Sequence, residues 1–406
     1  MRVIPHRGLI RWIVRSVALV GIYTFSDALA QTEGLSIRAP DAFYDPPAKV
    51  TGAPGTLLRS EPLEDVTLPT GMRGWRIKYT TTIDDKTPIT AVATVFTPVD
   101  PPKKPRPVII WEHGTTGLLQ KCMPSLLSAP TRGIPAVDRI VKAGWVIVAT
   151  DYSFAEKNGP HPYLLGEGEA RAGLDSVRAA RKMPELKLSD RAAVWGHSQG
   201  GQSALWTGIV GPRYAPDVKI VGVVAIAPGA DMTALLSANV ELDHWLGPYV
   251  ASSYSRFYPD IKFEQAVRPE VFAAAREMTK LCGFLPAEDA RKFAELLKTF
   301  EGPALATANN PMLAARIAQN TASKPIAAPL LIAQGMTDTI VTPAVTERYV
   351  DGRCYTGQRL EYWTFIDHDH NGIVQPGSKI EEPLINWTVA RFAGERQAAG
   401  CKHKSF

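Results

Sequence analysis

The stretch from Ala192 to Gly201 constrains this chain most strongly, because an apolar run leads into a glycine-bounded serine and then into a helix-like segment. Residues 196–200 (Gly-His-Ser-Gln-Gly) match G-x-S-x-G, in which a serine occupies a strained turn between a strand and a helix. Glycines are needed on both sides because the backbone approaches itself too closely for a Cβ atom. The alternative is an inert serine in a glycine-rich turn. The flanking patterns favour the strained turn, with the hydroxyl of Ser198 above a sheet.

Apolar runs that alternate with helical patterns predict an α/β fold. The runs at 108–111, 145–151, 219–226 and 329–334 are typical of strands buried on both faces of a parallel sheet. Residues 166–183 carry apolar side chains near helical spacing, and helical stretches of this kind between strands indicate βαβ units. We therefore expect a mainly parallel central sheet flanked by helices. Further strands are predicted at 74–82, 89–98 and 359–366.

Residues 231–327 separate two predicted strands by 97 residues that contain helical patterns and no comparable strand. Because an insertion of this length is a subdomain and not a loop, we interpret it as a helical cap over the serine. A lateral decoration with no role in substrate entry is the alternative. The core is then expected to comprise residues 31–230 and 328–406.

The first 30 residues have the pattern of a signal peptide. Four arginines precede a short apolar stretch at 17–25, and Ala28-Leu29-Ala30 supplies a cleavage site after Ala30. We therefore expect a secreted or periplasmic protein. No stretch is long enough for a transmembrane anchor. Removing residues 1–30 takes away four arginines and one aspartate and lowers the formal net charge from +5 to +2, so nothing indicates a nucleic-acid partner.

A serine nucleophile needs a base to take its proton and a third group to orient that base. On this kind of fold the acid follows the serine along the chain and the histidine comes last. Asp338 lies just after the predicted strand at 329–334, at the sheet edge where α/β active sites assemble, and is the best candidate for the acid. A solvated turn aspartate or a helix N-cap is the alternative for this residue.

Three histidines remain as candidates for the base. His370 precedes Asn371-Gly372 and suits a tight loop, His368 is two residues closer to its strand, and His403 lies in a charged tail. We favour His370, with His368 left as the alternative. The run Asp-His-Asp-His at 367–370 could also be a metal site, but short loops of this kind are usually solvated, so we expect neither metal nor cofactor.

A tetrahedral intermediate needs donors aimed at its oxyanion. One is expected from the backbone N–H of Gln199, directly after the serine, and another from the loop that follows the strand at 108–111. The N–H of Thr115 or Thr116 is the candidate there. His113, at the start of this loop, is expected to be structural.

The chain has four cysteines: Cys122, Cys282, Cys354 and Cys401. An even number in an exported protein favours two disulfides, for which three pairings are possible. No C-x-x-C or Cys/His spacing typical of a zinc site is present.

Together these motifs resemble the secretory lipase family of the α/β-hydrolase fold, which includes the lipase A enzymes. The matching segments are spread over about residues 70–390 and comprise 113–117, 122–125, 159–163, 196–201, 335–338 and 369–372. The resemblance implies Ser198 as nucleophile, Asp338 as acid and His370 as base, a helical cap, and acyl esters as substrates. It also implies that Cys122 pairs with Cys282, which leaves Cys354 with Cys401.

The expected function is therefore that of a secreted serine ester hydrolase, either a triacylglycerol lipase or a carboxylesterase, which acts through an acyl-enzyme. Its partner is expected to be a small-molecule or lipid ester, dissolved or at a lipid–water interface. Two alternatives belong to other classes: a serine peptidase or amidase with the same triad, and a non-catalytic binding protein that has kept the fold.

Overall fold

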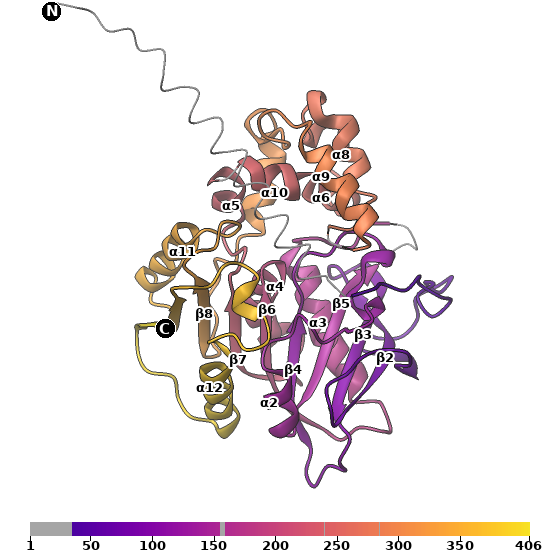
Figure 1. Ribbon diagram of the computed structural model, residues 1–406, viewed down its shortest axis with the longest axis vertical. Coiled ribbons are helices and arrows are strands. Elements are labelled where there is room, and N and C mark those ends of the chain that lie inside the picture. The colour runs from indigo at the N-terminus through magenta and orange to yellow at the C-terminus, as the bar shows by residue number, and fades with distance from the viewer. Residues whose placement is uncertain (1–34, 155–158, 239, 284) are drawn as a thin grey trace, which may run out of the picture.

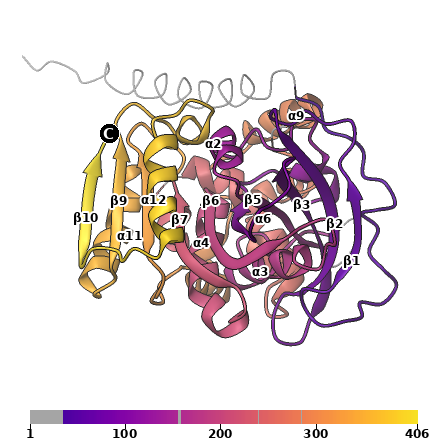
Figure 2. The same ribbon diagram turned by 90° about the horizontal axis from the view of Figure 1, so that it is seen from below.

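The computed structural model describes residues 35–154, 159–238, 240–283 and 285–406, so the predicted signal peptide lies outside the described residues. A mixed sheet forms the centre of this part of the chain, in the order β1-β2-β3-β5-β4-β6-β7-β8-β9-β10. Figure 2 shows it from β1 at one edge to β10 at the other. The strands are β1 (Leu57–Pro62), β2 (Met72–Thr82), β3 (Pro88–Pro98), β4 (Arg106–Glu112), β5 (Val146–Phe154), β6 (Leu188–His197), β7 (Lys219–Ile226), β8 (Leu330–Gly335), β9 (Leu360–Phe365) and β10 (Cys401–Ser405).

The sheet is parallel over most of its width, as the sequence predicts. β1, β2, β3 and β5 pair antiparallel in that order, whereas every pairing from β5 across to β10 is parallel. The sequence analysis missed β1 and β10, and the tail around His403 is an edge strand paired with β9. All five residues of β10 are exposed, so the strand has no alternation of apolar and polar residues that would reveal it.

The central strands are apolar throughout because they are covered on both faces. In β4, Val108 and Ile110 pack into one core cluster, while Ile109 and Trp111 pack into the other. Successive side chains of a strand point to opposite faces, so each face needs its own cover of helices. The first cluster includes residues of α3 (Gly166–Ala180), α4 (Gln199–Tyr214) and α11 (Pro343–Tyr355), and the second includes residues of α2 (Val137–Lys142) and α12 (Glu381–Ala393).

The segment between β7 and β8 is helical and stands beyond one end of the sheet (Figure 1). Its helices are α5 (Met232–Ala238), α6 (Val240–Phe257), α7 (Phe263–Ala266), α8 (Phe272–Met278), α9 (Ala287–Leu297) and α10 (Pro311–Gln319). They share a separate apolar cluster, which also takes in Tyr163, Leu164 and Leu165 ahead of α3. The helices thus pack on each other and on the loop beneath them.

Short 3-10 helices complete the secondary structure. They are η1 (Gln120–Cys122), η2 (Pro124–Leu126), η3 (Pro269–Val271), η4 (Thr307–Asn309) and η5 (Gly372–Val374). None of the helices within the described ranges combines the length and apolarity needed to cross a bilayer.

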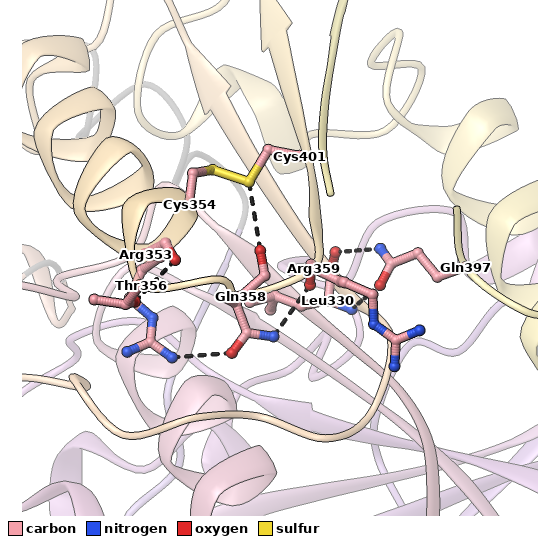
Figure 3. The surroundings of a disulfide bond; sticks show 8 residues. All are labelled: Leu330, Arg353, Cys354, Thr356, Gln358, Arg359, Gln397 and Cys401. Atoms are coloured by element: carbon pink, nitrogen blue, oxygen red, sulfur yellow. Dashed lines mark hydrogen bonds between the residues drawn. A yellow bond between two sulfur atoms is a disulfide. The ribbon is translucent and has the colours of Figure 1, made fainter. Parts of the chain in front are cut away.

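A disulfide between Cys354 and Cys401 attaches β10 to the end of α11 (Figure 3). Close by, the side chain of Gln397 both donates to and accepts from the backbone of Leu330, at 2.7 and 3.1 Å. The Arg353 guanidinium donates to the Gln358 side chain at 3.0 Å. Covalent and polar contacts therefore hold the C-terminal segment against the sheet, where exposed β10 offers little hydrophobic burial.

Candidate active site

Ser198 lies at the turn between β6, which ends at His197, and α4, which begins at Gln199. Its backbone has φ 58° and ψ −116°, a conformation that residues other than glycine rarely adopt. Surrounding bonds hold this strain, since the Ser198 N–H donates to the Ile226 carbonyl at 2.9 Å and its own carbonyl accepts from Gln202 and Gly229. The residue is partly exposed.

The two glycines of the motif are required by close backbone contacts. A Cβ atom on Gly196 would lie 1.9 Å from the carbonyl oxygen of Gly200, and one on Gly200 would lie 1.8 Å from the carbonyl oxygen of Glu112. Because the opposing atoms belong to the backbone, no rotation of a side chain could relieve such overlaps. The sharp turn that raises Ser198 therefore depends on both glycines.

His370 and Asp338 meet in the fold although 32 residues separate them. The Nδ1 atom of His370 lies 2.7 Å from Asp338 Oδ2, and both side chains are buried. The same Asp338 oxygen accepts from Gln334 Nε2 at 3.1 Å, while Oδ1 accepts the backbone N–H groups of Ile340 and Val341. The carboxylate is fully hydrogen-bonded, which keeps it oriented toward the imidazole and leaves His370 Nε2 available for another partner.

His197, the residue before the serine, positions the loop that carries His370. Its Nε2 lies 2.7 Å from the backbone carbonyl of His370, and the two rings are 4.7 Å apart. A carbonyl only accepts hydrogen bonds, so Nε2 of His197 carries the proton. Burial, together with the neighbouring His370, lowers the pKa of His197 to about 3, so this ring is neutral at pH 7. The ring of His370 therefore packs against the residue that precedes Ser198.

Glu112 holds the start of α4 on the end of β4. Its carboxyl group accepts from the hydroxyl groups of Ser203 and Thr207, the latter at 2.9 Å. Burial raises the pKa of Glu112 to about 8, so the group is mostly neutral at pH 7. The contact fixes α4, and with it Ser198, relative to the loop that follows β4.

The loop after β4 carries the predicted oxyanion residues and is tied to its neighbours at both threonines. The hydroxyl of Thr115 is 2.8 Å from the hydroxyl of Tyr163, and the carbonyl of Thr116 accepts the Gly283 N–H at 2.9 Å. On the other side of the serine, Gln199 is buried and donates from Nε2 to Glu169 at 2.7 Å. Both candidate donor segments are therefore immobilised by hydrogen bonds.

The second disulfide joins this region to the helical segment. Cys122 is bonded to Cys282, which is the pairing that the family resemblance implies. A Cβ atom on Gly117, which has φ +142°, would lie 2.6 Å from the Cys122 sulfur. The disulfide thus packs against Gly117 in the loop that follows β4.

A cavity of about 220 Å³ lies beside the site. Gly114, Thr115 and Thr116 line it together with His197 and Asn371, the neighbours of Ser198 and His370. Most of its remaining lining is apolar and includes Trp111, Leu127, Ile134, Leu285 and Val374. Apolar walls next to a few polar groups are typical of a small-molecule site.

The structure brings His370 to Asp338 and leaves the two other candidate histidines elsewhere. The His368 ring accepts the Lys379 N–H at 3.4 Å. The ring of His403, which lies in β10, stacks on the ring of Tyr362 in β9. Among the described residues, no group of His, Cys, Asp and Glu side chains could hold a metal ion.

Sequence reasoning missed Gln334 and Glu169, which contact Asp338 and Gln199 respectively. A polar residue at the end of the apolar run 330–333 was the available signal for Gln334. For Glu169, the signal was an acidic residue within the small-residue helix that begins at Gly166.

Comparison with known proteins identifies relatives of this chain. A model of the family described as secretory lipase matches residues 133–400. The chain is 24% identical to the secreted triacylglycerol lipase LIP2 of Malassezia globosa, over 95% of this chain and 88% of that protein. It is 23% identical to the probable inactive lipase MT1628 of Mycobacterium tuberculosis, over 88% and 83%. The structure of Candida antarctica lipase A superimposes with a TM-score of 0.69 at 18% identity, over 90% of this chain and 89% of that one, and therefore shares the fold.

Proposed function

This chain belongs to the secretory lipase family, and we propose that it hydrolyses acyl esters with Ser198 as nucleophile, His370 as general base and Asp338 as the acid that orients the base. One observation carries the proposal: the Asp338 carboxylate holds the buried ring of His370 by Nδ1, and this ring lies 4.7 Å from the ring of His197, the residue before the serine on the strained turn. The fold class is that of the lipase A-type α/β-hydrolases.

The arrangement supports a two-step reaction. Ser198 Oγ attacks the ester carbonyl while His370 Nε2 takes its proton, and a C–O bond forms to give a tetrahedral oxyanion. The intermediate collapses when His370 returns the proton to the departing alcohol oxygen, which leaves an acyl-enzyme. Water then repeats the sequence and releases the acid. The backbone N–H groups of Gln199 and of Thr115 or Thr116 are the proposed oxyanion donors.

We also propose that the helical segment at 231–327 acts as a cap that supplies an apolar surface to the substrate. Its cluster reaches Tyr163, whose hydroxyl contacts Thr115, and the ring of Tyr249 in α6 packs edge-on against Tyr163 at 5.7 Å. Apolar acyl chains suit such surroundings.

Export of the chain follows from its family, and cleavage after Ala30 is the proposed route.

Hydrolysis of p-nitrophenyl esters with acyl chains of two to sixteen carbons, run beside a triglyceride emulsion, tests the function directly. We expect ester turnover and covalent labelling by a fluorophosphonate probe. Activity on the emulsion would identify a lipase, and a preference for two- to four-carbon acyl groups without it would identify a carboxylesterase. An amide series with the same acyl groups serves as the control for a peptidase or amidase.

If the folded wild-type protein showed neither ester turnover nor probe labelling, that result would contradict the proposal and would favour a binding protein. The comparison with a relative described as a probable inactive lipase makes this control necessary.

Removal of the Cys122–Cys282 disulfide by substitution of both residues with serine is expected to lower both stability and activity. The bond closes a loop of 160 residues, so the chain-entropy estimate is a loss of about 5 kcal/mol in the free energy of unfolding. Activity should fall because the bond joins the segment beside the oxyanion loop to the cap. Chemical denaturation and ester turnover below the unfolding transition measure the two effects.

The Cys354–Cys401 pair provides the matched control, since it closes a loop of 47 residues far along the chain from the candidate oxyanion residues. Its removal is expected to cost about 4 kcal/mol while leaving turnover per folded molecule unchanged. Equal losses of turnover in the two variants would show that the first disulfide has no special connection to the site.

A further inference from the structure

Glu169 is a buried carboxyl group whose contacts lead to the oxyanion residues and to no cation. It lies in the first turn of α3 with 0% exposure, and its Oε1 accepts from Gln199 Nε2 at 2.7 Å and from the Leu164 N–H at 2.9 Å. Gln199 directly follows Ser198. The side chain of Glu169 is thus bonded to the residue whose backbone N–H is the first proposed oxyanion donor.

The second contact of Glu169 leads to the other side of the oxyanion site. Leu164, which donates to Glu169, has φ +54° and follows Tyr163 in the turn before α3. The Tyr163 hydroxyl bonds the hydroxyl of Thr115 at 2.8 Å. Glu169 Oε1 therefore binds the Gln199 side chain directly. The same oxygen also holds the turn that contains Tyr163, whose hydroxyl bonds Thr115.

The surroundings require this carboxyl group to be neutral. Within the described ranges no ion pair involves Glu169, and burial, together with the nearby Glu112, raises its pKa well above the ordinary value. Its second oxygen, Oε2, and the side-chain oxygen of Gln199 are both buried without a partner among the described residues. Both atoms can only accept while Glu169 is ionised, and a proton on Oε2 turns one of these two buried acceptors into a donor. An ionised group here would also repel the developing oxyanion.

We propose that Glu169 is a positioning residue for ester hydrolysis, which holds the two segments of the oxyanion site at their working separation and does so as the uncharged acid. This rests on the proposed function. Glu169 does not touch the substrate. It acts through Gln199 and through Tyr163, so its loss should weaken stabilisation of the transition state more than binding of the substrate.

Steady-state kinetics with a p-nitrophenyl ester tests the proposal through the separation of kcat from KM. Glu169→Ala is expected to lower kcat roughly 10- to 100-fold, while KM changes by less than about threefold. Glu169→Gln should stay within about threefold of wild-type kcat, because an amide offers one acceptor and one donor as the uncharged acid does. In the double variant with Gln199→Ala, the loss should be smaller than the product of the two single losses.

Asp175→Asn is the matched control on the same helix. Asp175 is also fully buried, but it bonds Thr81, Tyr214 and Arg178 and has no contact with the oxyanion residues. Its replacement is expected to lower the melting temperature and to leave kcat unchanged. The two variants are compared at a similar loss of stability. If kcat falls in Glu169→Ala and not in Asp175→Asn, the effect comes from positioning and not from a general weakening of α3.

Three results would overturn the inference while the proposed function stands. Wild-type kcat in folded Glu169→Ala would show that the contact has no kinetic role. An equal loss in Glu169→Gln and Glu169→Ala would show that an ionised carboxylate is required. A rise in KM alone would place Glu169 in substrate binding. A wild-type protein inactive on every ester would overturn the proposed function and, with it, this inference.

Discussion

Ser198→Ala is expected to lower kcat for a p-nitrophenyl ester by at least about 10⁴-fold and to abolish labelling by a fluorophosphonate probe. The proposed reaction has no other group to form the acyl-enzyme. Because the proposed triad acts as a unit, Ser198→Ala combined with His370→Ala should be little worse than either change alone. The fold should persist, since alanine removes only a partly exposed hydroxyl. Stopped assays and mass spectrometry of the labelled protein measure these effects.

His368→Ala is the matched control for His370→Ala. The two residues occupy one loop, but only His370 contacts Asp338, while the His368 ring accepts the backbone N–H of Lys379. We expect His370→Ala to lose activity as Ser198→Ala does and His368→Ala to keep turnover within a few-fold of wild type. The opposite result would mean that the base is His368 and that the proposed site is wrong.

Gly200→Ala is expected to prevent the turn at Ser198 from forming and to give either insoluble protein or folded protein without labelling. The added Cβ would meet the carbonyl oxygens of Glu112 and His113 at 1.8 and 2.8 Å. Since backbone atoms cannot rotate away, β4 and α4 would have to separate, and the cost belongs to the rare class above about 4 kcal/mol. Soluble yield, thermal unfolding and probe labelling report the outcome.

Gly352→Ala provides the opposite expectation in the same chain. Apart from its chain neighbours and the backbone of its own helix, a Cβ at this position in α11 has no heavy atom within 4 Å, and alanine favours a helix interior over glycine by about 0.5–1 kcal/mol. The variant should therefore be slightly more stable than wild type and fully active. A Gly200→Ala protein as stable and as active as Gly352→Ala would show that the contacts at the Ser198 turn are not as close as described.

The elements around the site were predictable because their signals are local. The strand 219–226 was predicted with the bounds that the structure has for β7, and the start of α3 was predicted at Gly166. A strand covered on both faces must be apolar throughout, and a helix with one buried face must carry its apolar residues at a period near 3.6. Buried elements therefore have patterns that can be recognised in the sequence. The edge strands β1 and β10 were missed because exposure leaves no such pattern in them.

The networks that support the site were not predictable. Gln334 and Glu169 contact Asp338 and Gln199 through the geometry of the fold. Their local patterns, a polar residue that ends an apolar run and an acidic residue in a small-residue helix, do not tell which residue each one contacts. The same holds for His197, whose bond to the His370 carbonyl spans 173 residues.

By itself, the sequence determined the class of fold, the strained turn at Ser198 and a short set of candidate partners, because each depends on neighbouring residues along the chain. Only the tertiary structure showed which of the two histidines of this loop contacts Asp338. The carbonyl of His368 is bound by the Thr337 N–H and packs against Gly335, and its ring lies outside the site, whereas His370 is turned toward Asp338. Contacts between the end of β8 and the loop after β9 determine which histidine faces Asp338. The spacing of residues along the sequence does not predict how two distant loops meet.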